Sequence, residues 1–203
     1  MALVAILIAS AAPERPDDGP PALWPWRDNE TLVEYQVRQL RDAGCDPVIV
    51  VLGTHEDAVR PLVHRAGVLA VINELYAEGR ASSVRVGAGA LGEDVDRALI
   101  LNVDQPRPSA VHGTLLAAVV ETEKLIAVPV HDGRRGHPVV FDRSLFPELR
   151  QVREATAGMR AVMQQHEADI LEVSFDTAVV TLDMNRPEDY EAARATYFEK
   201  VAS

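Results

Sequence analysis

The sequence predicts an α/β protein, built as a three-layer α/β/α sandwich around a mostly parallel sheet. Short, continuous apolar segments alternate with amphipathic segments from one end of the chain to the other. Strands that are apolar on both faces lie inside sheets that helices cover on both sides. The alternation itself is typical of consecutive βαβ units, which favours parallel strands.

The expected strands are the apolar runs of strand length. They lie at 2–9, 47–52, 98–103, 125–130, 138–141, 170–175 and 178–182. In such a sheet ligands bind beyond the carboxyl ends of the strands. The residues that follow each strand are therefore the first candidates for a functional site.

The first expected helix follows the loop after strand 2–9. The segment 31–40 carries its apolar side chains on one helical face, those of Leu32, Val33, Val37 and Leu40. Asn29 or Thr31 suits the N-cap position, and Gly44 ends the helix. Further helices are expected at 56–66, 82–91, 108–123, 157–166 and 187–201.

Composition sets the broad class. The 203 residues are 47% hydrophobic and contain no repetitive tract, which predicts one globular domain over 1–203. A formal net charge of −11 argues against nucleic acid or an anionic membrane as partner. The first apolar run is too short to span a bilayer and has no basic leader, so we expect a cytoplasmic protein. The lone Cys45 is expected to be a small buried residue.

The loop after the first strand is unsuited to a triphosphate. Phosphate-binding loops need glycines, free backbone N–H groups and a Lys or Arg. The segment 10–21 instead carries four prolines and three carboxylates, opposed only by Arg15. Each proline removes a backbone donor.

Three strand ends carry polar residues. Asp104 follows the buried strand 98–103 and precedes Pro106, where a carboxylate suits Mg²⁺ or caps a turn. Asp183 and Asn185 alternate after the last expected strand, so both side chains could face one ligand, although Asn185 also suits a cap before Pro187.

The third strand end is the turn 131–137, which carries His131, Arg134, Arg135 and His137. It suits a phosphate or carboxylate ligand, or is a solvated hairpin tip. The remaining histidines have no metal-ligand spacing, which argues against zinc, and no nucleophile elbow is present.

Six segments in order resemble the molybdenum cofactor nucleotidyltransferases, the MobA/MocA-like branch of the NTP transferase fold. The resemblance covers nearly the whole chain, and the segments are 22–34, 50–53, Asn73 with 79–84, 104–106, 135–138 and 185–189. It implies a Rossmann-like sheet of the nucleotide-diphospho-sugar transferase type. It also implies a reaction, in which the terminal phosphate of a pterin-type acceptor attacks the α-phosphorus of CTP or GTP.

The resemblance also implies roles for single residues. Arg15 and Asp104 would be catalytic, and Asp104 and Asn185 would bind Mg²⁺. Gln105, Arg135 and His137 would face the acceptor. The implied nucleotide-binding residues are Ala9, Ser10, Ala11, Asn73, Gly79, Ser82 and Ser83.

The chain departs from the family pattern at two turns. Of the signature loop Leu-Ala-Ala-Gly-x-Ser-x-Arg-Met-Gly-x-x-Lys only Arg15 is kept in place, and the turn 155–160 lacks the family's Gly-Asp pair. These departures predict a transferase that is weak or altered in its donor. The alternatives are a non-catalytic relative that binds a cofactor or a partner, such as a molybdoenzyme or a cofactor-handling protein, and a sugar-phosphate nucleotidyltransferase or glycosyltransferase.

Overall fold

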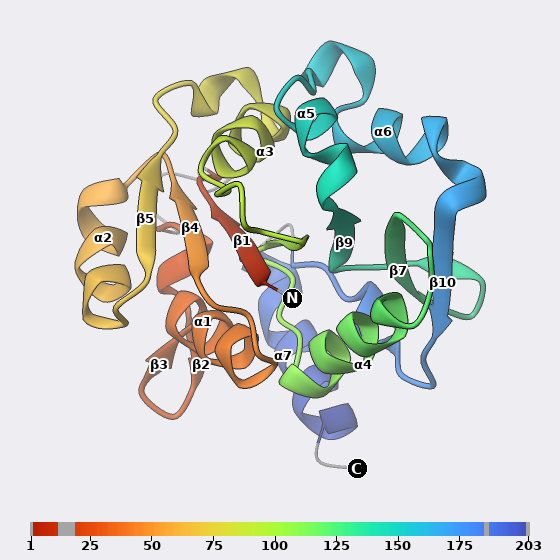
Figure 1. Cartoon of the computed structure of the whole chain (residues 1–203). Helices are drawn as coiled ribbons and strands as arrows, with labels where there is room; N and C mark the ends of the chain where they lie inside the picture. The colour runs from red at the N-terminus through yellow and green to blue at the C-terminus, as the bar shows by residue number, and fades with distance from the viewer. Residues whose placement is uncertain (1, 12–18, 185–186, 202–203) are drawn as a thin grey trace.

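The computed structural model describes residues 2–11, 19–184 and 187–201. Its centre is an eight-stranded sheet in the order β10-β7-β9-β6-β1-β4-β5, with β8 paired to β7 (Figure 1). The strands are β1 Leu3–Ala9, β4 Val48–Leu52, β5 Leu69–Ile72, β6 Arg97–Asn102, β7 Ile126–His131, β8 Arg134–Arg135, β9 Val139–Asp142 and β10 Ile170–Ser174. The pairs β1–β4, β1–β6, β4–β5 and β7–β10 are parallel, whereas β9 runs antiparallel to both of its neighbours. The predicted three-layer, mostly parallel α/β architecture is confirmed.

Helices cover both faces of the sheet (Figure 1). One face packs against α1 (Leu32–Asp42), α2 (Glu56–Arg65), α4 (Ser109–Val120) and α7 (Pro187–Val201), and the other against α3 (Arg80–Gly89), α5 (Phe146–Leu149) and α6 (Met159–Gln165). Alternate residues of β1 enter the two cores: Leu7 faces the α1 side and Ile6 faces the α3 side. A strand apolar on both faces is therefore what this position requires.

The hairpin of β2 (Pro25–Arg27) and β3 (Glu30–Thr31) precedes α1. Thr31 begins α1 as the predicted N-cap, and Glu34 closes a capping box with it. Cys45 is buried as predicted, and burial raises the pKa of its thiol to about 12. No helix in the described part of the chain has the length and apolarity needed to cross a membrane.

The expected strand 178–182 is wrong, because Ala178–Thr181 forms a 3-10 helix. The Thr177 side chain caps it by accepting a hydrogen bond from the backbone N–H of Val179. The carbonyl of Val180 then accepts from the backbone of His137 and from Arg107, rather than from a strand ladder. Strand β5 was not predicted from the sequence. This strand is short, lies at the edge of the sheet and follows directly after the turn that ends α2.

Candidate active site at the carboxyl edge of the sheet

Two cavities meet beyond the carboxyl ends of β1 and β6. The larger, of about 600 Å³, lies among α3, α6 and the segment 135–137. The smaller, of about 360 Å³, lies among the end of β1, Pro21, the segment 76–79 and Asp104. Ile8, Arg80 and Asn102 line both cavities and form their common wall. Two ligands bound here would meet at that wall.

Asp104 stands at the end of β6 in the wall of the smaller cavity. The residue is nearly buried, at 7% exposure, and its Oδ1 has no hydrogen-bond partner among the described residues. Its Oδ2 lies 3.7 Å from the Arg80 guanidinium. Burial first, and then the nearby Asp183, raise the pKa of Asp104 to about 6, against the opposing effects of Arg80 and Arg107. A buried carboxylate oxygen without a partner is suited to a cation.

Asp183 is held near Asp104 by backbone and side-chain contacts. The N–H of Met184 donates to the Asp104 carbonyl at 3.0 Å, and Gln105 Nε2 donates to Asp183 Oδ2 at 3.3 Å. The sequence predicted that Asp183 and Asn185 face one ligand. The structure brings Asp183 to Asp104, whereas Asn185 lies outside the described residues, as does Arg15.

Arg107 fixes the chain segments around these two carboxylates. It is fully buried, and its guanidinium donates to the carbonyls of His137, Val180 and Leu182 at 2.7–3.0 Å. Burial lowers the pKa of Arg107 to about 9, so it remains a cation at neutral pH. One side chain therefore ties the loop after β6, the turn before β9 and the segment that leads to Asp183.

A divalent metal fits this donor set. In the described part of the chain no cluster of three or more His, Cys, Asp or Glu side chains exists. Mg²⁺ does not require one, because it is commonly held by one or two carboxylates together with substrate phosphates and water. Asp104, with its free Oδ1, and Asp183 supply those two carboxylates.

The raised pKa of Asp104 predicts how its replacement changes stability. The pKa of about 6 in the folded protein lies above the value of about 3.9 for an unfolded chain. Protonation of Asp104 therefore stabilises the folded protein. This stabilisation is fully present below about pH 4 and is lost as the pH rises through about 6. Because asparagine cannot ionise, Asp104→Asn should raise the free energy of unfolding of the metal-free protein at pH 7.5 by about 2 to 3 kcal/mol.

Thermal unfolding in the presence of a chelator measures this effect. Near pH 4 the two proteins should unfold alike, and at pH 7.5 the Asp104→Asn protein should unfold at the higher temperature. A variant less stable than wild type at both pH values would make Asp104 a structural residue.

A buried polar network lies behind the smaller cavity. Asn73 Nδ2 donates to Ser82 Oγ at 2.8 Å and to Ser83 Oγ at 2.9 Å, and the hydroxyls of Ser83 and Ser10 lie 2.6 Å apart. Asn73, Ser82 and Ser83 are almost fully buried, and their polar groups form hydrogen bonds with one another. None of the three lines either cavity. Ala9 is buried in the core as well. Of the residues that the resemblance assigns to the nucleotide, Ser10, Ala11 and Gly79 line the smaller cavity, and the nucleotide-binding role of all seven stays a prediction.

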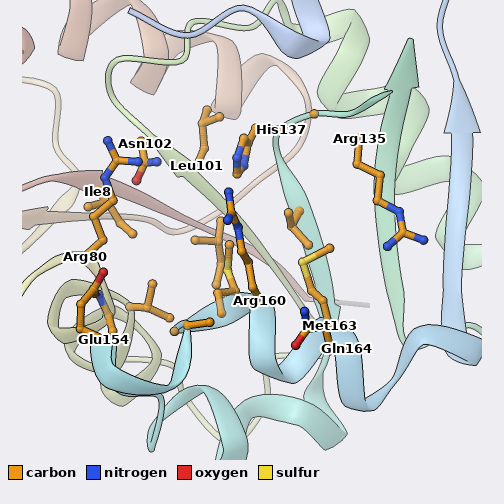
Figure 2. A pocket seen from close by; sticks show the side chains of 18 of the residues that line it. Ile8, Arg80, Leu101, Asn102, Arg135, His137, Glu154, Arg160, Met163 and Gln164 are labelled. Carbon is orange, nitrogen blue, oxygen red and sulfur yellow. The ribbon is translucent and has the colours of Figure 1, made fainter. Parts of the chain in front are cut away.

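Arg135 and His137 both line the larger cavity, but their side chains are held differently. Arg135 donates to Glu167 and Glu172 at 2.5–3.0 Å, and Figure 2 shows its guanidinium directed away from the middle of the larger cavity. His137 lines the cavity with a neutral ring, because burial lowers its pKa to about 4. Arg160 of α6 extends toward His137 instead (Figure 2). Gln105, also predicted to face the acceptor, is buried and contacts Asp183.

Sequence reasoning did not single out Arg80, Asn102 and Arg160 as site residues. Each carried a signal. Asn102 is a polar residue closing an apolar strand, and Arg80 and Arg160 lie in segments that resemble family turns. What the sequence does not indicate is the convergence of α3, β6 and α6 around the larger cavity, which depends on the packing of the sheet.

A family model for the MobA-like NTP transferase domain matches residues 5–170. The chain belongs to this family. A "Nicotine blue oxidoreductase" of Paenarthrobacter nicotinovorans is similar to it, with 29% identity over 174 residues that cover 79% of this chain and 80% of the relative.

Among solved structures, Rv0371c of Mycobacterium tuberculosis H37Rv aligns over 96% of this chain and 98% of its own, with a TM-score of 0.82 and 25% identity. The same protein has been solved in complex with manganese, at a TM-score of 0.77, 24% identity and coverage of 96% of this chain and 99% of its own. A nucleotidyl transferase from Methanothermobacter (Mth528) aligns over 98% of this chain and 99% of its own, with a TM-score of 0.81 and 17% identity. The fold is therefore of the nucleotidyltransferase type.

Proposed function

We propose that this MobA-like protein is a cytoplasmic, Mg²⁺-dependent nucleotidyltransferase that uses CTP or GTP and a phosphorylated, pterin-type acceptor such as molybdopterin. The observation that carries the proposal is the position of Asp104. Asp104 lines the smaller cavity two residues after Asn102 of the shared wall, its buried Oδ1 has no hydrogen-bond partner among the described residues, and a second carboxylate, Asp183, lies close by. An enzyme that joins two anionic substrates needs two adjoining pockets and a cation between them.

The smaller cavity suits the triphosphate and the larger one the acceptor. Asp104 and Asp183 would hold the metal, which would supply positive charge to the phosphates. Arg80 lines both cavities and Arg160 the larger one, so each can stabilise negative charge on the reacting phosphates. The manganese complex of the structural neighbour Rv0371c supports a divalent ion in this fold.

The proposed chemistry needs no protein base. An oxygen of the acceptor's terminal phosphate bonds to the α-phosphorus of the triphosphate, the bond from that phosphorus to the bridging oxygen breaks, and pyrophosphate leaves. At pH 7.5 Asp104, with a pKa of about 6, is mostly the carboxylate that a cation requires. The proline-rich segment 10–21 offers few backbone donors, so we expect weak binding of the triphosphate.

Pyrophosphate release tests the proposal. The protein is incubated with Mg²⁺, molybdopterin and each of CTP, GTP, ATP and UTP, and binding of each nucleotide is titrated calorimetrically. We expect release with CTP or GTP only when the acceptor is present. Binding without release would favour a non-catalytic relative that passes a cofactor to a partner such as a molybdoenzyme, and release with sugar phosphates would favour a sugar-phosphate nucleotidyltransferase.

One observation favours a second candidate, the reduction of a conjugated heteroaromatic compound. The relative named as a nicotine blue oxidoreductase matches 79% of this chain. The larger cavity also carries an apolar side made by Met159, Met163 and Val139, which a flat ring could contact. In this reaction a reduced nicotinamide nucleotide would give a hydride to the ring, which also takes up a proton. Oxidation of the nicotinamide nucleotide by nicotine blue, independent of metal, would support this candidate over nucleotidyl transfer.

A further inference from the structure

The wall between the two cavities contains one uncharged polar side chain, that of Asn102. It is the last residue of β6, and its register partner on β1 is Ile8. Ile8, Asn102 and Arg80 are the residues that line both cavities, and Figure 2 shows Asn102 beside Arg80. Ile8 offers only hydrocarbon, so Asn102 is the neutral hydrogen-bonding group of this wall.

The Asn102 amide is only loosely held by the protein. Its Nδ2 donates to Gln105 Oε1 at 3.3 Å, which is long for a hydrogen bond, and its Oδ1 accepts none within the described chain. Gln105 in turn donates to Asp183 at 3.3 Å. One Nδ2 hydrogen therefore stays free for a ligand, and the other can be exchanged at little cost.

We infer that Asn102 contacts both substrates at once, donating an amide hydrogen to an oxygen of the nucleoside triphosphate and another to the anionic oxygen of the acceptor. This inference rests on the proposed function, because it assigns one substrate to each cavity. Asn102 at the rigid end of β6 would then align the two substrates, because it holds the attacking oxygen of the acceptor against the phosphorus that it attacks. The amide nitrogen has only two hydrogens, so contact with both substrates replaces its 3.3 Å hydrogen bond to Gln105 Oε1.

The test compares two affinities in the same variants. Mg²⁺ with CTP is the probe of the smaller cavity, and inorganic phosphate is the probe of the larger one. Asn102→Asp keeps the size of the side chain but replaces the donor by a negative oxygen. Both affinities should fall at least about tenfold, because a hydrogen bond to a charged group contributes about 1.5 to 3 kcal/mol. Asn102→Leu removes the donor without adding charge and should also weaken both.

Three matched variants separate this effect from general ones. Arg160 lines the larger cavity and Ala11 the smaller one, so Arg160→Gln should weaken phosphate alone and Ala11→Asp should weaken CTP alone. Asn29→Asp makes the same chemical change at an exposed turn and should alter neither affinity. Thermal unfolding of each variant confirms that it is folded.

The outcomes are distinct. If the Asn102 variants lose affinity for one probe only, or for neither, the shared contact is wrong, whether or not the wild-type protein transfers nucleotides. If both affinities fall while the wild-type protein releases no pyrophosphate with any acceptor, the contact stands as a binding feature and the proposed transfer fails. A wild-type protein that binds neither probe contradicts both.

Discussion

Asp104→Asn is expected to lower the rate of pyrophosphate release by at least about a hundredfold. An amide oxygen carries no formal charge, so the variant loses half of the two-carboxylate site while its shape is kept. A metal ion contributes several kcal/mol to the stabilisation of charge in a transition state, which corresponds to two or more orders of magnitude in rate. The measurement is steady-state release of pyrophosphate with the nucleotide and acceptor that the wild-type protein uses.

The control for this variant is Asp132→Asn. Asp132 lies in the exposed turn between β7 and β8, with a side chain that is 88% exposed, and lines neither cavity. The Asp132→Asn substitution makes the same change in net charge. It should leave the rate of pyrophosphate release within about twofold of wild type, since exposed charges contribute little. A folded Asp104→Asn protein that releases pyrophosphate at the wild-type rate would remove Asp104 from the reaction.

Gly136→Ala is expected to destabilise the fold by about 3 kcal/mol or more. Gly136 is buried, and a Cβ at this position would overlap the backbone carbonyl of Val180. Its N–H donates to the Pro129 carbonyl at 2.8 Å, and the next residue, His137, donates to Val180 at 3.0 Å. Neither backbone can move without breaking these bonds, so the cost should reach the upper end of the 1 to 3 kcal/mol usual for overpacking.

Thermal unfolding of Gly136→Ala should show a drop of about 6 to 12 °C at this chain length. Gly113→Ala is the matched control, because Gly113 lies inside α4 with open space where its Cβ would stand. That variant should gain about 0.5 to 1 kcal/mol from helix propensity. Equal effects of the two alanines would show that the approach of Gly136 to Val180 does not constrain the fold.

The layers of the fold could be predicted from the sequence because the core strands are apolar on both faces. Strand β1 shows this: its alternate residues enter two different cores, and no other element class requires that pattern. The segment 178–182 has the same apolar character, yet it forms a 3-10 helix, since the Thr177 cap and the acceptor role of Val180 depend on partners far away in the sequence. The sequence of a segment alone does not indicate such long-range hydrogen bonds.

The candidate site could be predicted only where a strand end marks it. Asp104 was found because an acid directly after a buried strand must lie at the ligand-binding edge of the sheet. Arg107, three residues further on, gave no such signal, and only the structure shows that its guanidinium holds the segments around Asp104 and Asp183. Arg135 was expected to bind an anion, whereas Glu167 and Glu172, more than thirty residues away, hold its guanidinium.

The most direct test of the central claim, that Asp104 and Asp183 form a divalent-metal site where two cavities meet, is a titration with Mn²⁺ in the absence of nucleotide. Bound and free Mn²⁺ are separated by their electron paramagnetic resonance signal for the wild-type, Asp104→Asn, Asp183→Asn and Asp132→Asn proteins. We predict one Mn²⁺ per chain for the wild-type and Asp132→Asn proteins, with affinity that weakens as the pH falls through about 6, because Asp104 then takes up a proton. Loss of that binding in both Asp104→Asn and Asp183→Asn would support the account, and unchanged Mn²⁺ affinity in either of them would contradict it.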